Sequence, residues 1–274
     1  MATILDDILT RTRADLKTRE AAVPLRKLEA AAADAPPARD FTAALRPENR
    51  AAGSPLGLIA EVKRASPSAG PIAEGADPVG VARTYEAAGA NCVSVLTDGP
   101  FFGGSLDDLK AVRAAIGLPV LRKDFIVSRY QLAEARAAGA DAVLLIAECL
   151  PGEGLTALHA AAGEFGLHTL IELYEPEHMP RVAALAAAAP GRTVVGVNNR
   201  DLRTFTVDLE HSLRLVADCP AGVTFVSESG IRTRAEIDRL AAAGVGAALI
   251  GETLMRAPDP AAKVRELVGS FEPE

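Results

Sequence analysis

The chain has 274 residues, 49% hydrophobic and 24% charged, a balance typical of a globular protein and not of a disordered, collagen-like or disulfide-rich chain. With 29 Lys and Arg against 36 Asp and Glu, the formal charge is −7, which argues against binding to a nucleic-acid backbone or an anionic membrane. A small anionic substrate remains compatible with this charge, because a local basic pocket can oppose the sign of the whole chain.

Cysteine and histidine are sparse and widely spaced, with three cysteines and four histidines. The cysteines form no CxxC pair and the histidines no HxxxH pair, so the sequence predicts no metal site and no disulfide framework. No apolar stretch is long enough to span a bilayer, and the acidic N-terminus does not resemble a secretory signal. We therefore expect a cytoplasmic protein without membrane contact.

The first 50 residues are predicted to be helical. Ile4, Leu5, Ile8 and Leu9 form a stripe at helical spacing, and a second apolar, alanine-rich stretch runs up to the Pro36-Pro37 break. We expect residues 1–50 to form an extension packed on a domain of residues 51–274; a mobile tail is the alternative.

From residue 51 onward, short runs rich in Val, Ile and Leu recur about once per strand–helix unit. Nearly continuous hydrophobicity is typical of parallel strands buried on both faces. The eight runs are Leu56–Val62, Cys92–Leu96, Pro119–Leu121, Ala142–Ile146, Thr169–Leu173, Val194–Val197, Val223–Val226 and Ala247–Ile250.

Alanine-rich helical stretches separate these runs, and several end in a glycine just before the next run. Gly89, Gly139, Gly166 and Gly244 occupy this place, where a left-handed helix cap requires φ above zero. Eight repeated strand–helix units predict an α/β fold, a (β/α)8 TIM barrel with an N-terminal helical extension. A doubly wound open sheet is the alternative, but no GxGxxG follows the first strand.

Charged and polar residues gather where the predicted strands end, which is where barrels of this kind carry their active sites. Glu61 and Lys63 lie two residues apart and so point the same way. Such charges are costly to bury unless they are paired or used in catalysis. The arrangement predicts an acid–base site, with a set of purely structural ion pairs as the alternative. The strand-end residues are Glu61, Lys63, Lys123, Glu172, Asn198, Arg200 and Glu228.

Small residues end the last two strands, where many barrels bind a substrate phosphate through backbone N–H groups. Ser229, Gly230 and Gly251 allow close backbone approach to an anion, and Ser66 could add a hydroxyl. We therefore expect a phosphorylated small-molecule substrate.

Several segments at the strand ends together resemble indole-3-glycerol phosphate synthase, and the resemblance covers essentially the whole chain. The EVKRASPS and RKDFI segments are the most specific. The segments are 61–68 (EVKRASPS), 95–98 (VLTD) with 101–105 (FFGGS), 122–126 (RKDFI), 197–202 (VNNRDL) and 227–231 (SESGI).

The resemblance implies an enzyme of tryptophan biosynthesis that needs no cofactor. Its substrate would be 1-(2-carboxyphenylamino)-1-deoxyribulose 5-phosphate, converted to indole-3-glycerol phosphate with loss of carbon dioxide and water. Lys123 would be the general acid and Glu172 the general base. Glu61 and Lys63 would assist dehydration and hold substrate groups, while Asn198 would bind sugar hydroxyls or order the lysines.

The remaining roles implied by the resemblance concern binding. Glu228 would act alongside Asn198, and Arg200 would meet the anthranilate carboxylate or support the rim. Phe102 and Phe125 would form apolar walls for the anthranilate ring, with ordinary core packing as the alternative. The phosphate would be bound by Ser66, Ser229, Gly230 and Gly251.

Three other functions remain as alternatives. A phosphoribosylanthranilate isomerase would be expected to use a cysteine–aspartate pair, and no cysteine ends the first strand. A Schiff-base lyase needs a lysine with a depressed pKa, whereas carboxylates near Lys63 and Lys123 would raise it. A non-catalytic barrel would not need a complete acid–base set. We expect a monomer, with dimers through helix faces as the other option.

Overall fold

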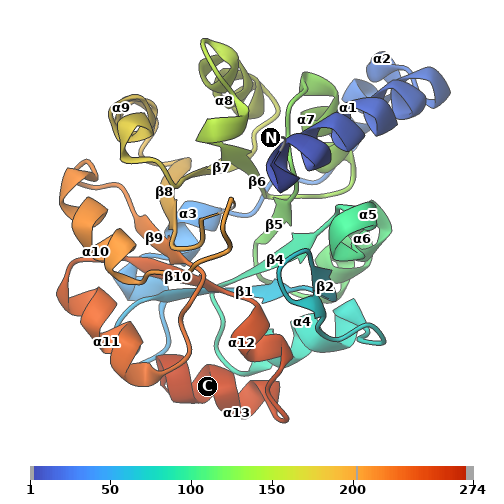
Figure 1. Cartoon of the computed structure of the whole chain (residues 1–274). Helices are drawn as coiled ribbons and strands as arrows, with labels where there is room; N and C mark the ends of the chain where they lie inside the picture. The colour runs from blue at the N-terminus through green and yellow to red at the C-terminus, as the bar shows by residue number, and fades with distance from the viewer. Residues whose placement is uncertain (1–2, 202, 270–274) are drawn as a thin grey trace.

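The computed structural model describes residues 3–201 and 203–269. The first two residues of the expected extension, Leu202 of the VNNRDL segment and the last five residues of the expected barrel domain lie outside this described part. Eight parallel strands close into a barrel, in the order β1-β10-β9-β8-β7-β6-β5-β4 (Figure 1). The predicted TIM-barrel fold is therefore confirmed. The strands are β1 (Gly57–Val62), β4 (Cys92–Leu96), β5 (Val120–Lys123), β6 (Ala142–Ile146), β7 (His168–Leu173), β8 (Thr193–Asn198), β9 (Phe225–Glu228) and β10 (Ala247–Ile250).

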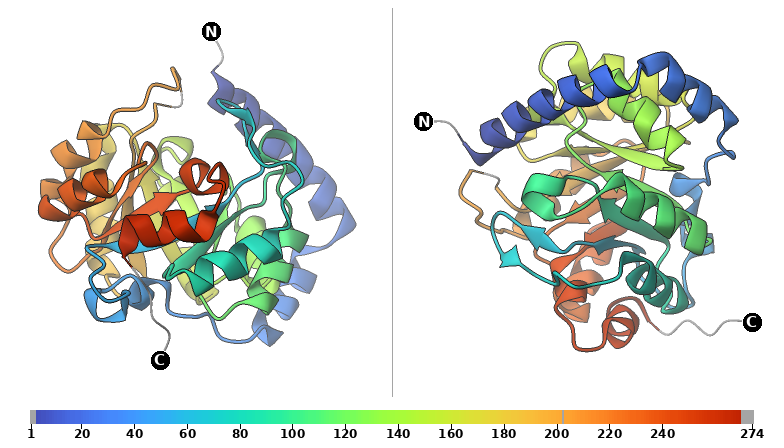
Figure 2. Two further views of the ribbon diagram at one scale, coloured as in Figure 1. Left: turned by 90° about the horizontal axis from the view of Figure 1, so that it is seen from below. Right: turned by 90° about the vertical axis from the view of Figure 1, so that its right-hand side faces the viewer.

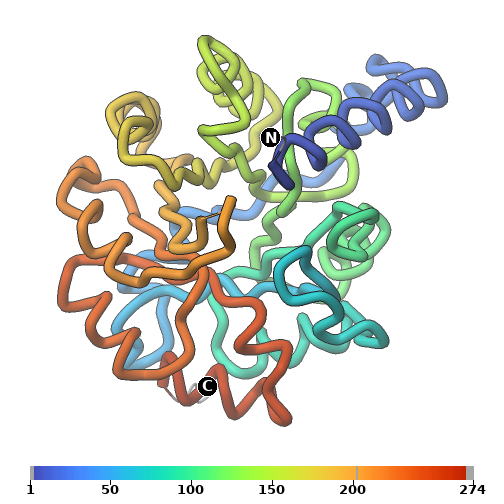
Figure 3. Tube along the Cα trace, in the orientation of Figure 1, coloured from blue at the N-terminus to red at the C-terminus, as the bar shows by residue number. Residues whose placement is uncertain are grey.

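The helices that connect the strands form a ring outside the barrel, which the chain trace of Figure 3 follows once around. Their apolar faces pack on the strands, so that the interface between strands and helices forms one continuous core. The helices after β1 are α4 (Pro78–Ala87), α5 (Gly99–Phe102), α6 (Leu106–Ala115), α7 (Arg129–Ala137), α8 (Gly154–Glu164), α9 (Met179–Ala188), α10 (Glu210–Leu215), α11 (Arg234–Ala242), α12 (Glu252–Met255) and α13 (Pro260–Val268).

All eight predicted apolar runs overlap a barrel strand, and three of them match its bounds. Three of the apolar runs end before their strands do. The sixth run ends one residue before Asn198 of β8. The third ends at Leu121 and the seventh at Val226, whereas β5 continues to Lys123 and β9 to Glu228, residues that the sequence analysis placed at the strand ends. The charged ends of these strands continue the hydrogen-bonded ladder because their side chains find partners inside the barrel mouth.

The predicted glycine caps adopt the left-handed conformation. The φ angles are +101° for Gly89, +88° for Gly139, +70° for Gly166 and +96° for Gly244. Each glycine ends the helix before a strand, which makes the chain reverse direction sharply enough to enter the barrel.

The N-terminal segment is helical, as expected, and its first helix lies along the outside of the barrel (Figure 2). Arg19 bonds Glu134 of α7 at 2.9 Å, and the Tyr130 hydroxyl donates to two carbonyls near the end of the first helix. These contacts fix the helix on α7. The segment comprises α1 (Ile4–Ala22), α2 (Leu25–Asp34), α3 (Phe41–Ala44) and the 3₁₀ turn Pro47–Asn49.

The sequence did not predict a small hairpin after β1. β2 (Ala65–Ser66) and β3 (Gly70–Pro71) pair antiparallel, at the same end of the barrel as the cavity described below. Among the described residues, no helix is long and apolar enough to cross a membrane.

Candidate active site

A cavity of about 510 Å³ opens at the carboxyl ends of the barrel strands. Each residue that the sequence predicted for the site lines this cavity. These residues are Glu61, Lys63, Ser66, Phe102, Lys123, Phe125, Glu172, Asn198, Arg200, Glu228, Ser229, Gly230 and Gly251. These predicted residues come from seven of the eight strands or from the loops directly after them. They lie together because the carboxyl ends of parallel strands meet at one end of a barrel.

Lys123 lies at the centre of a buried cluster of acids. Its Nζ atom is 2.9 Å from Glu172 Oε2 and 3.5 Å from Glu228 Oε2. Asn198 donates from Nδ2 to the other oxygen of Glu172 at 3.1 Å. The ammonium group therefore bridges two carboxyl groups from β7 and β9, the strands on either side of β8, and the amide orients one of them.

The cluster separates the protonation states of its members. Burial alone would lower the pKa of Lys123, but the carboxylates of Glu172, Glu228 and Glu61 raise it well above its ordinary value. Burial acts to raise the pKa of Glu172, yet the Lys123 charge and the hydrogen bonds lower it. Burial and then the Glu172 charge raise the pKa of Glu228. These shifts favour the charged form of Lys123, the ionised form of Glu172 and the protonated form of Glu228.

Glu61 of β1 and Lys63, which directly follows that strand, form a second pair. Lys63 Nζ lies 2.8 Å from Glu61 Oε1, and both side chains face the cavity, as the strand alternation predicted. Gly251 of the facing β10 end leaves room for the Glu61 carboxylate, since a Cβ atom there would overlap Glu61 Oε1.

The turn after β9 adopts a conformation that suits an anion. Ser229 has a φ of +67° and Gly230 a φ of +84°. A Cβ atom on Gly230 would overlap Val207 Cγ1, so only glycine fits this position. The hydroxyl of Ser66 contacts Ser68 Oγ and accepts from Ala69 N, which ties it to its own hairpin as well as to the cavity wall.

Apolar side chains form the other side of the cavity. The rings of Phe102 and Phe125 have centroids 6.1 Å apart. Ile4, Leu5 and Ile8 of α1 line the same cavity. The predicted helical stripe of the extension thus contributes directly to the site.

The sequence and its relatives identify the family. A family profile described as indole-3-glycerol phosphate synthase matches residues 5–267. An indole-3-glycerol phosphate synthase of Rhodopirellula baltica is 54% identical over 268 residues, which is 98% of this chain and 100% of that protein. The chain belongs to the indole-3-glycerol phosphate synthase family. A relative of the same name from Mycobacterium avium is 46% identical, covering 97% of this chain and 94% of that protein.

Solved structures confirm the fold alone. A tryptophan synthase alpha-subunit mutant from Pyrococcus furiosus has a TM-score of 0.57 at 16% identity, covering 80% of this chain and 98% of that one. A 3-hexulose-6-phosphate synthase has a TM-score of 0.61 at 19% identity, covering 79% of this chain and 100% of that one. By its family, the protein is a carboxy-lyase of tryptophan biosynthesis that forms indole-3-glycerol phosphate. This membership excludes the isomerase, the Schiff-base lyase and the non-catalytic barrel.

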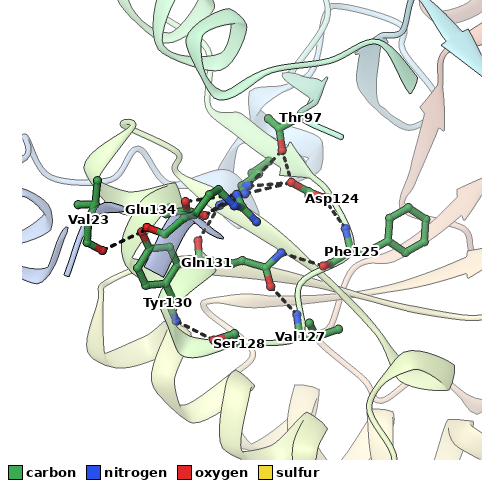
Figure 4. A network of polar contacts seen from close by, with 11 residues as sticks. Val23, Thr97, Asp124, Phe125, Val127, Ser128, Tyr130, Gln131 and Glu134 are labelled. Atoms are coloured by element: carbon green, nitrogen blue, oxygen red, sulfur yellow. Dashed lines mark hydrogen bonds and ion pairs between the residues drawn. The ribbon is translucent and has the colours of Figure 1, made fainter. Parts of the chain in front are cut away.

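A buried polar network positions the strand end that carries Lys123 (Figure 4). Arg122 is fully buried and points away from the cavity; it donates to the Gln131 carbonyl at 2.7 Å and to Asp124 Oδ2 at 3.0 Å. Asp124 also accepts from Thr97 and from Phe125 N. Arg122 and Asp124 are therefore fixed between the barrel and α7. Lys123 and Phe125 alternate with these two residues along the chain.

Several cationic side chains of the cavity were missed by sequence reasoning. Arg232 follows the turn after β9, Arg256 follows α12 and Lys263 belongs to α13. Glu252 Oε1 bonds Arg256 Nε at 3.0 Å, and its other oxygen lies 3.6 Å from Arg200 Nη2. The signal in the sequence was that these residues follow the last two strands. That position does not distinguish a cationic side chain that lines the cavity from one on the surface.

The cavity differs in charge from the chain as a whole. Its lining includes six cationic and five acidic side chains, a net formal charge of +1, whereas the chain carries −7. No group of three or more His, Cys, Asp or Glu among the described residues could hold a metal ion.

Proposed function

We propose that this enzyme closes the indole ring of 1-(2-carboxyphenylamino)-1-deoxyribulose 5-phosphate by general acid–base catalysis, with Lys123 as the acid and Glu172 as the base. The observation that carries the proposal is the 2.9 Å contact between a charged lysine and an ionised glutamate inside the cavity at the strand ends. An ammonium group there can both stabilise and protonate an oxygen that becomes negative.

The first step forms a carbon–carbon bond. The aromatic carbon that bears the carboxylate attacks the ribulose carbonyl carbon, and the carbonyl oxygen takes a proton from Lys123. Loss of carbon dioxide from the same ring carbon then returns its bonding electrons to the ring and restores aromaticity. The product of this step carries a hydroxyl group where the carbonyl was.

The second step removes water. Glu172 takes a proton from the methylene carbon next to the ring nitrogen, and the hydroxyl leaves with a proton from an acid. Lys63 is 2.8 Å from Glu61 and lines the cavity, so this pair is placed to supply that proton and recover it. Burial and the Glu172 charge favour the protonated form of Glu228, whose Oε2 atom lies 3.5 Å from Lys123 Nζ, so this carboxyl group is placed to return a proton to the first acid.

The binding roles follow from the chemistry of each wall. Phe102 and Phe125 would form apolar walls for the anthranilate ring, and Arg200 would meet its carboxylate. Asn198 would bind sugar hydroxyls while it orients Glu172. The phosphate would lie on the glycine-rich ends of β9 and β10, bound by Ser66, Ser229, Gly230 and Gly251.

We further propose that the reaction needs no metal or organic cofactor, since the acid, the base and the anion-binding groups are supplied by side chains and backbone. Turnover that is unchanged after treatment with a chelator would support this. We also propose a monomeric cytoplasmic enzyme, with residues 1–50 as an extension on the barrel domain of residues 51–274.

Replacing the proposed acid tests the mechanism. Lys123→Ala should lower kcat by about 10²–10⁴-fold, because the developing oxyanion loses its proton donor. The chain has no Trp, so indole fluorescence from the product rises over a quiet background. Lys110→Ala is the matched control, since Lys110 is exposed on α6. A kcat near that of the parent in folded Lys123→Ala would contradict the assignment.

The phosphate site has its own test. Gly230→Leu should raise KM more than it lowers kcat, because a side chain at this position displaces the turn that would bind the phosphate. An unchanged KM in the folded variant would place the phosphate elsewhere.

A further inference from the structure

Asn199 stands next to the proposed site but does not line the cavity. It follows the last residue of β8 and is only 1% exposed. Its Oδ1 atom accepts from Ser212 N at 3.0 Å and from Ser212 Oγ at 2.8 Å. Its Nδ2 group donates to Ser227 Oγ at 3.0 Å and to the Ser229 carbonyl at 3.1 Å. Both lone pairs and both protons of the amide are therefore used.

Asn199 holds two successive carbonyl groups of the turn after β9. Its side chain donates to the Ser229 carbonyl, and its backbone N–H donates to the Glu228 carbonyl at 2.8 Å. In a trans peptide the C=O and N–H bonds point in opposite directions. With both carbonyls turned toward Asn199, the N–H groups of Ser229 and Gly230 are turned away from it.

These two N–H groups are available for a ligand. Within the described residues, neither donates a hydrogen bond to the protein, and both Ser229 and Gly230 line the cavity. Two successive free N–H groups in a turn form a concave anion-binding site. This is the feature that the proposed phosphate site requires.

The turn needs support from outside itself. Ser229 adopts a φ of +67°, which disfavours any residue with a Cβ atom. Such a conformation persists only where the surrounding structure imposes it. The hydrogen bond from Asn199 Nδ2 acts directly on the carbonyl of this residue, and Ser212 in turn fixes the Asn199 amide.

We propose that Asn199 is a positioning residue that holds the Ser229–Gly230 turn in the conformation that binds the substrate phosphate. The inference rests on the phosphate site of the proposed function and adds a residue to it. Asn198 donates its side-chain hydrogen bond to Glu172, so the two adjacent amides have separate roles. The first orients the catalytic base and the second shapes the phosphate turn.

The test measures phosphate binding separately from chemistry. In Asn199→Ala, KM and the inhibition constant of inorganic phosphate should rise together by about 10–100-fold, the loss expected for a buried hydrogen bond that shapes a site. The kcat value should stay within about threefold of the parent, because an interaction that binds substrate and transition state equally does not change it.

Two further variants keep the test decisive. Asn91→Ala is the matched control, since Asn91 is buried with hydrogen bonds at the opposite end of the barrel. It should lower stability without moving the phosphate inhibition constant. If Asn199→Ala does not fold, Asn199→Asp keeps the acceptor for Ser212 but lacks the two side-chain donors. It should raise the same two constants.

Unchanged phosphate inhibition in a folded Asn199 variant would overturn the inference, as would a loss confined to kcat. Gly230→Leu distinguishes a failure of the positioning role of Asn199 from a failure of the phosphate site itself. If Gly230→Leu raises the phosphate inhibition constant and the Asn199 variants do not, the positioning role fails and the phosphate site stands. If neither change affects it, the phosphate binds elsewhere and both fail.

Discussion

Gly196 of β8 leaves the space that the Glu228 carboxyl group occupies, and Gly196→Ala should fill it. A Cβ atom at this position would lie 2.9 Å from Leu170 Cδ1 and closer still to Glu228 Oε1. Carbon atoms pack best at about 3.5–4.0 Å, so the neighbours must move by about 1 Å. Leu170 is fully buried, and Glu228 lies between Gly196 and Lys123, so the carboxyl group has to shift within the cluster.

Two magnitudes follow from this displacement. Overpacking of a tight core costs about 1–3 kcal/mol of unfolding free energy. In a chain of this size that lowers Tm by roughly 2–12 °C. A misplacement of about 1 Å among catalytic groups lowers kcat by about 100-fold. The loss of activity should therefore greatly exceed what the loss of stability explains at a temperature where the variant is folded.

The assay is steady-state indole fluorescence at 25 °C, with Tm from circular dichroism. Gly246→Ala is the matched control, because its Cβ atom would lie 2.9 Å from Thr224 Cγ2 at the opposite end of the barrel. It should lose stability and keep its kcat. A kcat for Gly196→Ala within about twofold of the parent would refute the reasoning, since it would mean that the place of the Glu228 carboxyl group is not critical.

Three further predictions concern stability and reactivity. Asp141 is fully buried and accepts from Arg39 N, Val120 N and Arg113, so Asp141→Ala should lower the unfolding free energy by about 3–5 kcal/mol with KM unchanged. Burial lowers the pKa of His168 below its ordinary 6.5, with a smaller opposing effect of Asp40. The unfolded chain therefore binds a proton more readily, and urea unfolding should show stability falling below about pH 6.5, less steeply in His168→Gln. Burial raises the pKa of Cys219 to about 11, so a thiol reagent near pH 8 should react about 100-fold faster after denaturation.

Each of these has a clear contrary result. An Asp141→Ala protein as stable as the parent would mean that the buried carboxylate is not needed at the base of the barrel. Equal pH slopes for the parent and His168→Gln would remove His168 from the acid response. Equal thiol reactivity before and after denaturation would mean that Cys219 is accessible.

Much of the fold could be predicted because its signals are local. The runs that became β6 and β10 are apolar throughout and the run that became β4 is apolar except for Ser94, as expected for parallel strands buried on both faces. Hydrophobicity alone stopped short of Lys123 and Glu228, because charged residues are unfavourable in a buried strand, and their position directly after the apolar runs was what placed them at the ends of β5 and β9. The β2–β3 hairpin was missed because strands of two residues have no periodicity to detect.

The site was predictable where it depends on strand ends and not where it depends on packing between distant elements. Strand alternation placed Glu61 and Lys63 together, and the structure brings them to 2.8 Å. Arg256 and Lys263 reach the cavity from α12 and α13, whose position on the barrel is not encoded in their spacing. Asn199 could not be separated from Asn198 by sequence, since the two adjacent amides differ only in the side of β8 on which they lie.

The contrast between the cavity and the rest of the chain separates two physical properties of the enzyme. Because the cavity side chains have a net formal charge of +1, the remainder must carry −8 to give the −7 of the whole chain. Electrostatic repulsion between copies of the protein arises from the charge of the residues outside the cavity. Binding of a substrate with two anionic groups, a carboxylate and a phosphate, depends on the few cations that line the cavity. Substitutions can therefore change solubility and substrate affinity independently, because the two properties depend on different residues.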